Sequence, residues 1–232
     1  MGRVHGIVSD IRWVASTPST NTALRSEPIG SVLATLNQTA GRGRLGRDWL
    51  ESAGKGLAIS VVVHPTDVPT LVPLVAGAAL VSVLTGHGVD AWMKWPNDVY
   101  IGERKVAGVL TEMPEPGRII VGLGVNVRHA QGELPLDTAT SLAAEGLDLD
   151  ATEIADAWLA TVRTRLAEVG TPGLIAWVRS VSALIGQRVA IDMPDGTRRE
   201  VDVHDIARNG ALELSTGETI VAGEVTRLRR AE

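Results

Sequence analysis

The sequence predicts an α+β fold: a mixed, largely antiparallel central sheet with helices packed on it, followed by a small β-barrel. Two observations support this prediction. In the first part of the chain, short runs of branched apolar residues, typical of strands, alternate with longer runs of helical length. After Gly186, four or five short alternating stretches separated by turn residues fit into fewer than fifty positions, which is typical of a small barrel.

The first part of the chain contains four strand-like runs, one hairpin and one apolar helix. The run from Pro69 to His87 is apolar at nearly every position, and we expect a buried helix that ends at Gly86 and Gly88. The hairpin is expected to turn near Gly102, so that Lys105 opens its returning strand. Strands are predicted at residues 31–38, 57–64, 89–96 and 118–127, and the hairpin at residues 99–113.

Two more helices are predicted before the barrel. The first runs from about Thr152 to Val169, with Asp150 as its N-cap and an apolar stripe at helical spacing. The second lies around Gly173 to Leu184. After this helix the sequence changes to short alternating strands separated by turns. This change divides the chain into a larger domain at residues 1–184 and a barrel at residues 185–232.

Composition limits the possible classes of protein. The chain has 232 residues, of which 44% are hydrophobic, so it can form a substantial core. It has no cysteine, which excludes a disulfide framework, a cysteine-based zinc site and a thiol nucleophile. No apolar run of signal-peptide length opens the chain, and the stretch from Leu71 to Leu84 is shorter than the ~20 residues that span a bilayer. We expect a cytoplasmic protein without membrane segments. The formal net charge of -5 argues against nucleic-acid binding over the whole surface.

The segment QTAGRGRLGRDW, from Gln38 to Trp49, concentrates three arginines and three glycines in this acidic chain. Glycine lets the backbone approach a ligand closely, and planar guanidinium groups bind anions such as phosphate with paired hydrogen bonds. A nucleic-acid patch of the RGG kind, or a solvated surface loop, would have the same composition. The flanking strands favour a loop held over one site on a sheet, and the spacing of a Walker phosphate-binding loop is missing.

Two further segments place charged side chains beside predicted strands. In KWPNDVY, the strand stops at Pro96, which brings Lys94, Asn97 and Asp98 close to one turn. Asp98 is a ligand type that Mg²⁺ prefers, but Pro-Asn-Asp is also an ordinary turn signal. In RKVAGVL, Lys105 is either an edge residue that extends to solvent or a buried ammonium directed at an anion.

Two polar segments are equally open to more than one interpretation. Asn126 in GLGVNV stands among apolar strand residues, so its amide must either satisfy backbone groups or read the edge of a base. The hydroxyl-rich segment from Ser16 to Thr22, STPSTNT, is either an ordinary N-cap or turn, or a ring of donors and acceptors for the polar head of a ligand.

In this order and spacing, STN, the arginine segment, KWPNDVY, RKVAGVLTE and GLGVNV resemble the motifs of the biotin–protein ligase family, the biotin–[acetyl-CoA-carboxylase] ligases, in its monofunctional type. The motifs cover Ser19 to Asn126, and the resemblance extends loosely to the C-terminus. It implies that residues 1–184 form the biotin-adenylating catalytic domain. It also implies that residues 185–232 form an SH3-like barrel.

The resemblance implies a ligase reaction in two steps, with ATP, biotin and Mg²⁺. The carboxylate of biotin attacks the α-phosphate of ATP, giving biotinoyl-5′-AMP and pyrophosphate. A lysine of the biotin carboxyl carrier domain of an acyl-CoA carboxylase then attacks the acyl carbonyl, and AMP leaves. Our hypothesis for the arginine segment is a lid, ordered by the ligand, that keeps water away from the adenylate.

Roles for individual residues also follow from the resemblance. Lys105, between the biotin carboxylate and the α-phosphate, and Arg44 are the catalytic candidates, and Asp98 is the metal candidate. The biotin-binding candidates are Ser19, Thr20, Asn21, Gln38, Gly41, Arg42, Gly43, Arg44, Lys105 and Gly108. The candidates for ATP or adenylate binding are Arg44, Arg47, Trp49, Lys94, Asn97, Lys105 and Asn126.

Three alternatives stay open at this point: a lipoate–protein ligase, a non-enzymatic nucleic-acid-binding protein, and a ligase-like protein without activity. The STN motif begins within twenty residues of Met1, so we expect no N-terminal helix-turn-helix domain and no DNA binding. Both a monomer and a homodimer are compatible with the sequence.

Overall fold

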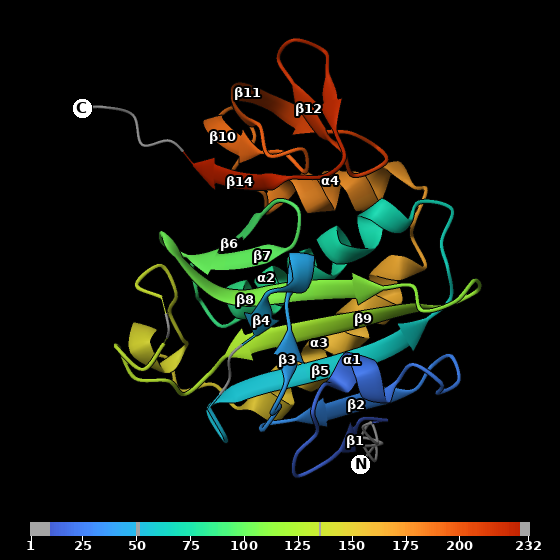
Figure 1. The fold of residues 1–232 in the computed structure, drawn as a ribbon, viewed down its shortest axis with the longest axis vertical. Coiled ribbons are helices and arrows are strands. Elements are labelled where there is room, and N and C mark those ends of the chain that lie inside the picture. Colours follow the sequence, from blue (N-terminus) through green and yellow to red (C-terminus); the bar gives the residue numbers. More distant parts are fainter. Residues whose placement is uncertain (1–9, 50–51, 135, 228–232) are drawn as a thin grey trace, which may run out of the picture.

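The computed structural model describes residues 10–49, 52–134 and 136–227 (Figure 1). Its centre is a seven-stranded sheet in the order β1-β2-β5-β9-β8-β7-β6. Within it β1 and β2 are parallel and the other neighbours are antiparallel, which confirms a mixed, largely antiparallel sheet. The strands are β1 (Arg12–Trp13), β2 (Val32–Thr35), β5 (Gly56–Val63), β6 (Ala91–Lys94), β7 (Asp98–Ile101), β8 (Arg104–Glu112) and β9 (Ile119–Asn126).

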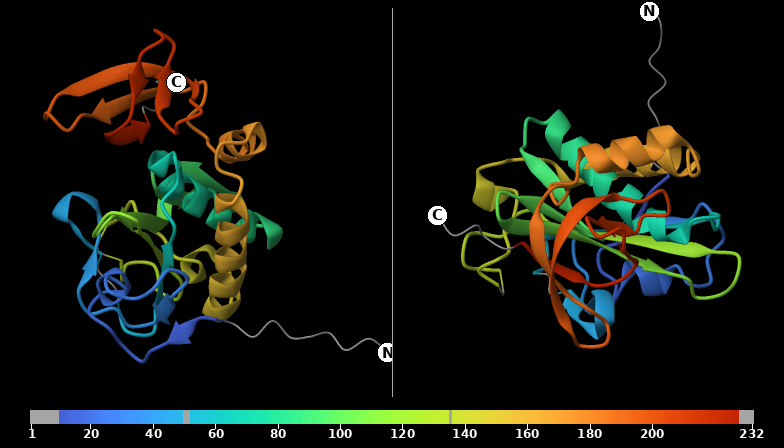
Figure 2. Two further views of the ribbon diagram at one scale, coloured as in Figure 1. Left: turned by 90° about the vertical axis from the view of Figure 1, so that its right-hand side faces the viewer. Right: turned by 90° about the horizontal axis from the view of Figure 1, so that it is seen from above.

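The central strands are apolar along most of their length because both faces of the sheet are covered. β5 pairs with β9 over eight residues, and all of β5 except its last residue is buried. Helices α2 and α3 lie on one face of the sheet, whereas α1 and a small hairpin lie on the other (Figures 1 and 2). A strand buried on both faces has a continuous apolar run rather than an alternating one, which is why these strands are evident in the sequence.

Helix α2 (Val72–Gly86) is the expected buried helix; it follows the 3₁₀ turn η2 (Pro69–Leu71). The segment Pro69–Gly86 is long and apolar enough to cross a membrane, but it is the core helix, packed between the sheet and α3. Helix α3 (Ala151–Leu166) has Asp150 as its N-cap, as expected. Inside the interface, Trp158 Nε1 donates to the carbonyl oxygen of Ala76 at 2.9 Å, so a fully buried indole joins the two helices.

The opposite face holds the elements that the sequence did not reveal. Helix α1 (Thr20–Ala23) is a single turn, capped by the Ser19 hydroxyl. The arginine segment is a short hairpin rather than a plain loop. It comprises β3 (Gly41–Arg42), the 3₁₀ turn η1 (Arg44–Gly46) and β4 (Asp48–Trp49), and we call it the arginine hairpin. It lies across the sheet in front of β8 and β9 (Figure 1).

The last helix, α4 (Pro172–Ser180), ends four residues earlier than predicted. The backbone N–H of Met93 in β6 donates to the carbonyl oxygen of Val181 at 2.8 Å, so the chain leaves the helix to cover the edge of the sheet. The predicted C-terminal strands form a second antiparallel sheet, in the order β13-β12-β11-β10-β14. They are β10 (Arg188–Asp192), β11 (Arg198–Ile206), β12 (Leu212–Leu214), β13 (Thr219–Ile220) and β14 (Glu224–Arg227).

The C-terminal sheet is fastened to the rest of the molecule by polar contacts over a shared apolar core. Trp95 Nε1, buried after β6, donates to the carbonyl oxygen of Gly210 at 2.9 Å. Arg179 at the end of α4 donates to the carbonyl oxygen of Ile206 and pairs with Asp205 at 2.8 Å. Buried residues of both units belong to one hydrophobic cluster. The C-terminal sheet therefore has a fixed place at one end of the central sheet (Figure 2).

The α2–α3 contact generates a stability prediction. Trp158→Phe removes a buried hydrogen bond and leaves a small void, so we expect a loss of roughly 1–3 kcal/mol in the free energy of unfolding. Trp177→Phe makes the same chemical change at a half-buried ring whose centroid lies 4.6 Å from Arg165. It should cost under about 1 kcal/mol. Urea unfolding measures both, and equal losses would show that the buried hydrogen bond is not what matters.

Candidate functional site

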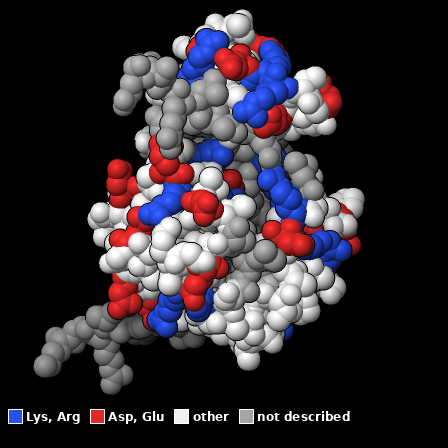
Figure 3. Space-filling model, turned by 60° about the vertical axis from the view of Figure 1, so that its left-hand side comes forward, with Lys and Arg blue, Asp and Glu red and all other residues white. Residues whose placement is uncertain are grey.

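A cavity of about 550 Å³ lies between the arginine hairpin and the glycine-rich strands β8 and β9. Its wall is completed by the segment that contains Ala139 and by Val225 of β14, so the C-terminal sheet contributes to the cavity. Lys and Arg side chains lie beside the hollow beneath that sheet (Figure 3). Every candidate residue from the sequence except Gly41 lines this cavity. Segments that are more than a hundred positions apart in the chain thus meet at one site.

One end of the cavity is a buried, uncharged polar cluster. Gln38 Oε1 accepts hydrogen bonds from the backbone N–H of Thr20 at 2.9 Å and from its hydroxyl at 3.2 Å. Ser60 Oγ lies 2.7 Å from Thr20 Oγ1 and 2.6 Å from Asn21 Oδ1. These side chains and Ser19 are each at most 8% exposed. Within the described part of the chain, the side-chain hydrogen bonds of Gln38 use its oxygen alone, so its amide N–H groups can donate to a ligand acceptor.

The floor of the cavity is a patch of sheet without side chains. Gly108 of β8 pairs with Gly124 of β9, and Gly122 lies two residues away on the same face. A Cβ atom on Gly124 would lie 2.6 Å from the indole of Trp49, and one on Gly122 would lie 2.1 Å from Asn21 Oδ1. The three glycines therefore let Trp49 and Asn21 rest directly on the backbone of the sheet.

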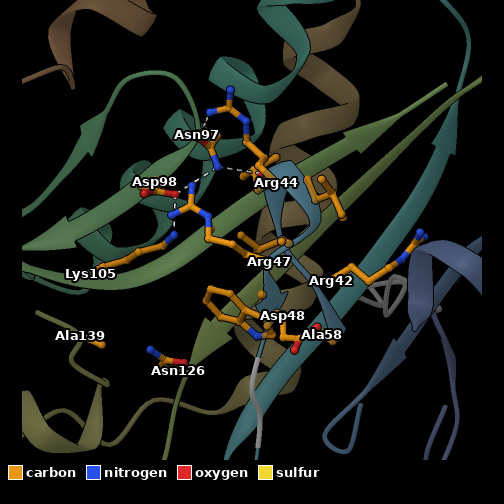
Figure 4. A pocket seen from close by; sticks show the side chains of 18 of the residues that line it. Arg42, Arg44, Arg47, Asp48, Ala58, Asn97, Asp98, Lys105, Asn126 and Ala139 are labelled. Carbon is orange, nitrogen blue, oxygen red and sulfur yellow. Dashed lines mark hydrogen bonds and ion pairs between the residues drawn. The ribbon is translucent and has the colours of Figure 1, made fainter. Parts of the chain in front are cut away.

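The other end of the cavity is cationic. Arg44 Nη1 donates to Asn97 Oδ1 at 2.7 Å, and Asn97 is itself anchored by donating to the carbonyl oxygen of Val109 at 3.0 Å. Lys105 Nζ lies 2.7 Å from Asp98 Oδ1. In Figure 4, Arg44 and Arg47 extend from the hairpin toward Asn97 and Asp98, so the predicted phosphate-binding side chains do converge.

Burial shifts the ionisation of groups at this cationic end. Desolvation lowers the pKa of Arg44 and of Lys94, and the nearby charge of Arg47 lowers them further, while Asp98 opposes the shift. Lys94 Nζ donates to the phenol oxygen of Tyr100 at 3.0 Å. Burial raises the pKa of Tyr100 to about 12, and the Asp98 charge adds to the rise. Partly desolvated cations held side by side gain from an anion that enters between them.

Asn126 lies at the far side of the same floor. Its Nδ2 donates to the carbonyl oxygen of Thr140 at 2.9 Å, and the residue is 6% exposed. The backbone N–H of Thr140 donates in turn to the carbonyl oxygen of Lys105 at 2.8 Å. The segment that contains Thr140 therefore connects Asn126 to Lys105, and Figure 4 shows both side chains on the same side of the hairpin.

Arg42 and Gly41 are placed differently from the other candidates in the hairpin. Arg42 extends away from Arg44 and Arg47 (Figure 4), and its Nη2 contacts the carboxylate of Glu112 at 3.0 Å. Gly41 is not among the residues that line the cavity, and a Cβ atom on it would lie 2.5 Å from the carbonyl oxygen of Trp49. The packing of the hairpin therefore requires a residue without a side chain at this position.

Several residues at the site were not singled out from the sequence. Ser60 appears there as one polar residue in an apolar strand, and Glu112 as the last residue of a strand; only the fold brings them to Asn21. Among the described residues, no group of three or more His, Asp or Glu side chains is arranged to hold a metal. Asp98, the metal candidate, is paired with Lys105, so by itself it does not form a cation site.

Comparison with known proteins assigns this architecture. The model of the biotin/lipoate A/B protein ligase family matches residues 13–126. The biotin–[acetyl-CoA-carboxylase] ligase of Mycobacterium tuberculosis is 36% identical over 93% of this chain and 88% of its own length. The chain belongs to the biotin protein ligase family. The bifunctional ligase/repressor BirA of Bacillus subtilis is 30% identical, over 93% of this chain and 70% of its own.

Solved structures of biotin protein ligases share the fold. The Aquifex aeolicus biotin protein ligase in complex with biotin and ATP superposes with a TM-score of 0.81 at 28% identity, covering 94% of this chain and 98% of that one. The Leishmania major biotin protein ligase in complex with biotinyl-5-AMP has a TM-score of 0.64 at 23% identity. At this identity the match shows a shared fold only. The resemblance to this family read from the motifs is thus confirmed.

The glycine floor generates a prediction about packing. Gly124→Ala places a methyl group against the Trp49 ring, so we expect a loss of roughly 1–3 kcal/mol in the free energy of unfolding. Gly86→Ala, at the end of α2 where nothing lies within 4 Å, should be neutral or stabilising by up to about 1 kcal/mol. In a Trp49→Ala background the cost of Gly124→Ala should fall by more than half. An unchanged cost in that background would contradict the proposed clash.

Tyr100 is the one tyrosine in the chain, so its ionisation can be followed directly. With a pKa of about 12, roughly a tenth of the phenol should be ionised at pH 11 in the folded protein, compared with roughly nine tenths in urea. Because the folded pKa is higher than the unfolded one, Tyr100 stabilises the fold below pH ~10, and this contribution is lost as the pH rises toward 12. The phenolate absorbance at 295 nm measures it. Asp98→Asn should lower the folded pKa; no change there would contradict the role of the Asp98 charge.

Proposed function

We propose that this protein is a biotin–protein ligase: it activates biotin with ATP to biotinoyl-5′-AMP and transfers biotin to a lysine of a carrier domain. The observation that carries the proposal is the polarity of the cavity under the arginine hairpin. Buried amides and hydroxyls at one end suit an uncharged ring that needs both donors and acceptors. The cations at the other end suit a carboxylate and a phosphate, and the glycine floor between them suits a narrow aliphatic chain.

The first step brings two anions together, the biotin carboxylate and the α-phosphate of ATP. The cations of the site reduce the repulsion between them. In this proposal Lys105 lies between the biotin carboxylate and the α-phosphate, and Arg44 contacts the same phosphate. As the carboxylate oxygen attacks phosphorus and pyrophosphate leaves, negative charge grows on the phosphoryl oxygens. Fixed, partly desolvated cations stabilise that charge without the reorganisation that water would need. Asp98, 2.7 Å from Lys105 Nζ, orients the lysine until substrates arrive.

The second step needs no nucleophile from the enzyme. The amine of the carrier lysine attacks the acyl carbonyl, the C–O bond to the phosphate breaks, and AMP leaves as the amine loses its proton. Until the carrier arrives, the mixed anhydride must be kept from water. The arginine hairpin, lying over the cavity, suits this role, with Gln38 at the ring of biotin and Trp49 and Asn126 at the adenine.

Several further assignments belong to the same proposal. Mg²⁺ would enter with the phosphates of ATP and neutralise part of their charge, with Asp98 as the protein's contact, since Mg²⁺ commonly needs only one or two carboxylates beside phosphate oxygens. The C-terminal sheet would form the SH3-like barrel of the family, with the boundary near residue 185. The partner would be the biotin carboxyl carrier domain of an acyl-CoA carboxylase, and the acting form a monomer or homodimer.

ATP–pyrophosphate exchange tests the proposal. We expect exchange with biotin and none with lipoate or without an acid. Lys105→Gln should reduce the exchange rate by roughly 10²–10³-fold because one charge-stabilising contact is lost. Lys55→Gln is the matched control, since Lys55 pairs with Glu133 at the surface and does not line the cavity, and it should exchange normally. Exchange with lipoate alone would place the protein with lipoate ligases, and none with either acid would overturn the proposal.

A further inference from the structure

Glu112, the last residue of β8, is a junction of three segments. Its carboxylate accepts hydrogen bonds from Asn21 Nδ2 at 2.8 Å, from Arg25 Nη2 at 3.0 Å and from Arg42 Nη2 at 3.0 and 3.1 Å. The Glu112 side chain is 19% exposed, against 49% for Arg25 and 39% for Arg42. A carboxylate that is less exposed than both of its cations is the fixed centre of the group, and the arginines close over it.

The orientation of the Asn21 amide depends on this carboxylate. Asn21 Nδ2 faces two groups that can only accept, the Glu112 carboxylate and the carbonyl oxygen of Leu110 at 3.2 Å. The amide oxygen is therefore turned to Ser60 Oγ, 2.6 Å away, inside the polar end of the cavity. Since Ser60 also touches Thr20, which binds Gln38, the orientation set by Glu112 extends through the polar cluster.

The same carboxylate holds the arginine hairpin. Arg42, on the first strand of the hairpin, donates to Glu112 and to the hydroxyl of Thr22 at 2.9 Å. At the other end of the hairpin, Arg44 is fastened to Asn97. The hairpin is thus tied to the body at its base by Glu112 and near its tip by Asn97. The base contact lies outside the cationic cluster, so it acts on the hairpin and not on a phosphate.

We propose that Glu112 is a positioning residue that couples the polar end of the cavity to closure of the arginine hairpin. One carboxylate fixes the amide of Asn21, at the proposed biotin ring, and clamps Arg42 of the lid. Occupation of the polar end then favours the closed hairpin, and opening of the hairpin weakens ligand binding, since coupling between two sites is reciprocal. This inference rests on the proposed function, and it makes Arg42 a latch rather than a ligand contact.

The rate at which the enzyme releases its adenylate tests whether the contact between Glu112 and Arg42 keeps the hairpin closed. The adenylate is formed on the enzyme from radiolabelled biotin and ATP without a carrier domain, and its escape is followed after dilution by rapid filtration. Glu112→Gln and Arg42→Gln should each release it about tenfold faster, which corresponds to roughly 1.4 kcal/mol. Both should also weaken biotin binding. The double variant should release it no more than about twofold faster than either single variant, because both changes break the same contact between Glu112 and Arg42.

Arg25→Gln is the matched control. Arg25 binds the same carboxylate from the solvent side but belongs to neither the hairpin nor the cavity lining, so its release rate should stay within about twofold of the wild type. Glu112→Asp keeps the charge and shortens the side chain by one methylene, so it should release the adenylate at an intermediate rate. If Glu112→Gln fails to fold, Arg42→Gln and Glu112→Asp carry the test.

Three results would overturn the coupling. They are unchanged release from Arg42→Gln, a double variant whose effect is the product of the two single effects, and an Arg25→Gln variant as leaky as Arg42→Gln. Each is read in protein that shows biotin-dependent pyrophosphate exchange, so it is distinct from failure of the proposed function, in which the wild type shows no exchange. In Arg42→Gln the biotin concentration for half-maximal exchange should rise by a larger factor than the maximal exchange rate falls, which separates a latch from a catalytic contact.

Discussion

A strand normally places a side chain over each face of its sheet at alternate positions, and in β8 and β9 this would fill the space under the arginine hairpin. Gly108, Gly122 and Gly124 leave that space free. Because they are neighbours across the two strands, their effect adds up to a flat patch of backbone large enough to receive an indole ring. The position of Trp49, the seat of Asn21 and the depth of the cavity all depend on it. The covered opposite face, packed against α2, keeps this patch rigid.

The cations of the site are each held by a neighbouring side chain. The chain as a whole is acidic, yet cations from three separate segments meet at one end of the cavity, and each is held by an uncharged or acidic neighbour. Asn97 orients Arg44, and Asp98 pairs with Lys105. Such partners offset the repulsion between the cations. They also make each contact replaceable by a ligand anion, which a buried, fully satisfied ion pair would not be.

The sequence predicted the long elements well because their physical signals are local. A short stretch of sequence is enough to predict each of them. Examples are the apolar run of α2, the cap of α3 at Asp150, and the strands β5 and β9, which are buried on both faces. The motif segments likewise pointed to the cavity lining. The contacts of Ser60 and Glu112 could not be predicted, since they depend on the register of strands that are far apart in the chain. The direction of Arg42, the one-turn helix α1 and the early end of α4 are also tertiary effects, set by Glu112, by the sheet face and by Val181.

The burial of α2 over most of its length has a consequence for how the chain reaches this structure during synthesis. A helix that is apolar on every side has no face suited to water, so it needs the sheet on one side and α3 on the other. Residues of α3 leave the ribosome well after α2, and some sheet partners also follow it. In that interval the most apolar segment of the protein is uncovered and prone to associate with other chains. Yield and solubility on overexpression should therefore depend on chaperone capacity and on an intact α3, even for changes far from the cavity.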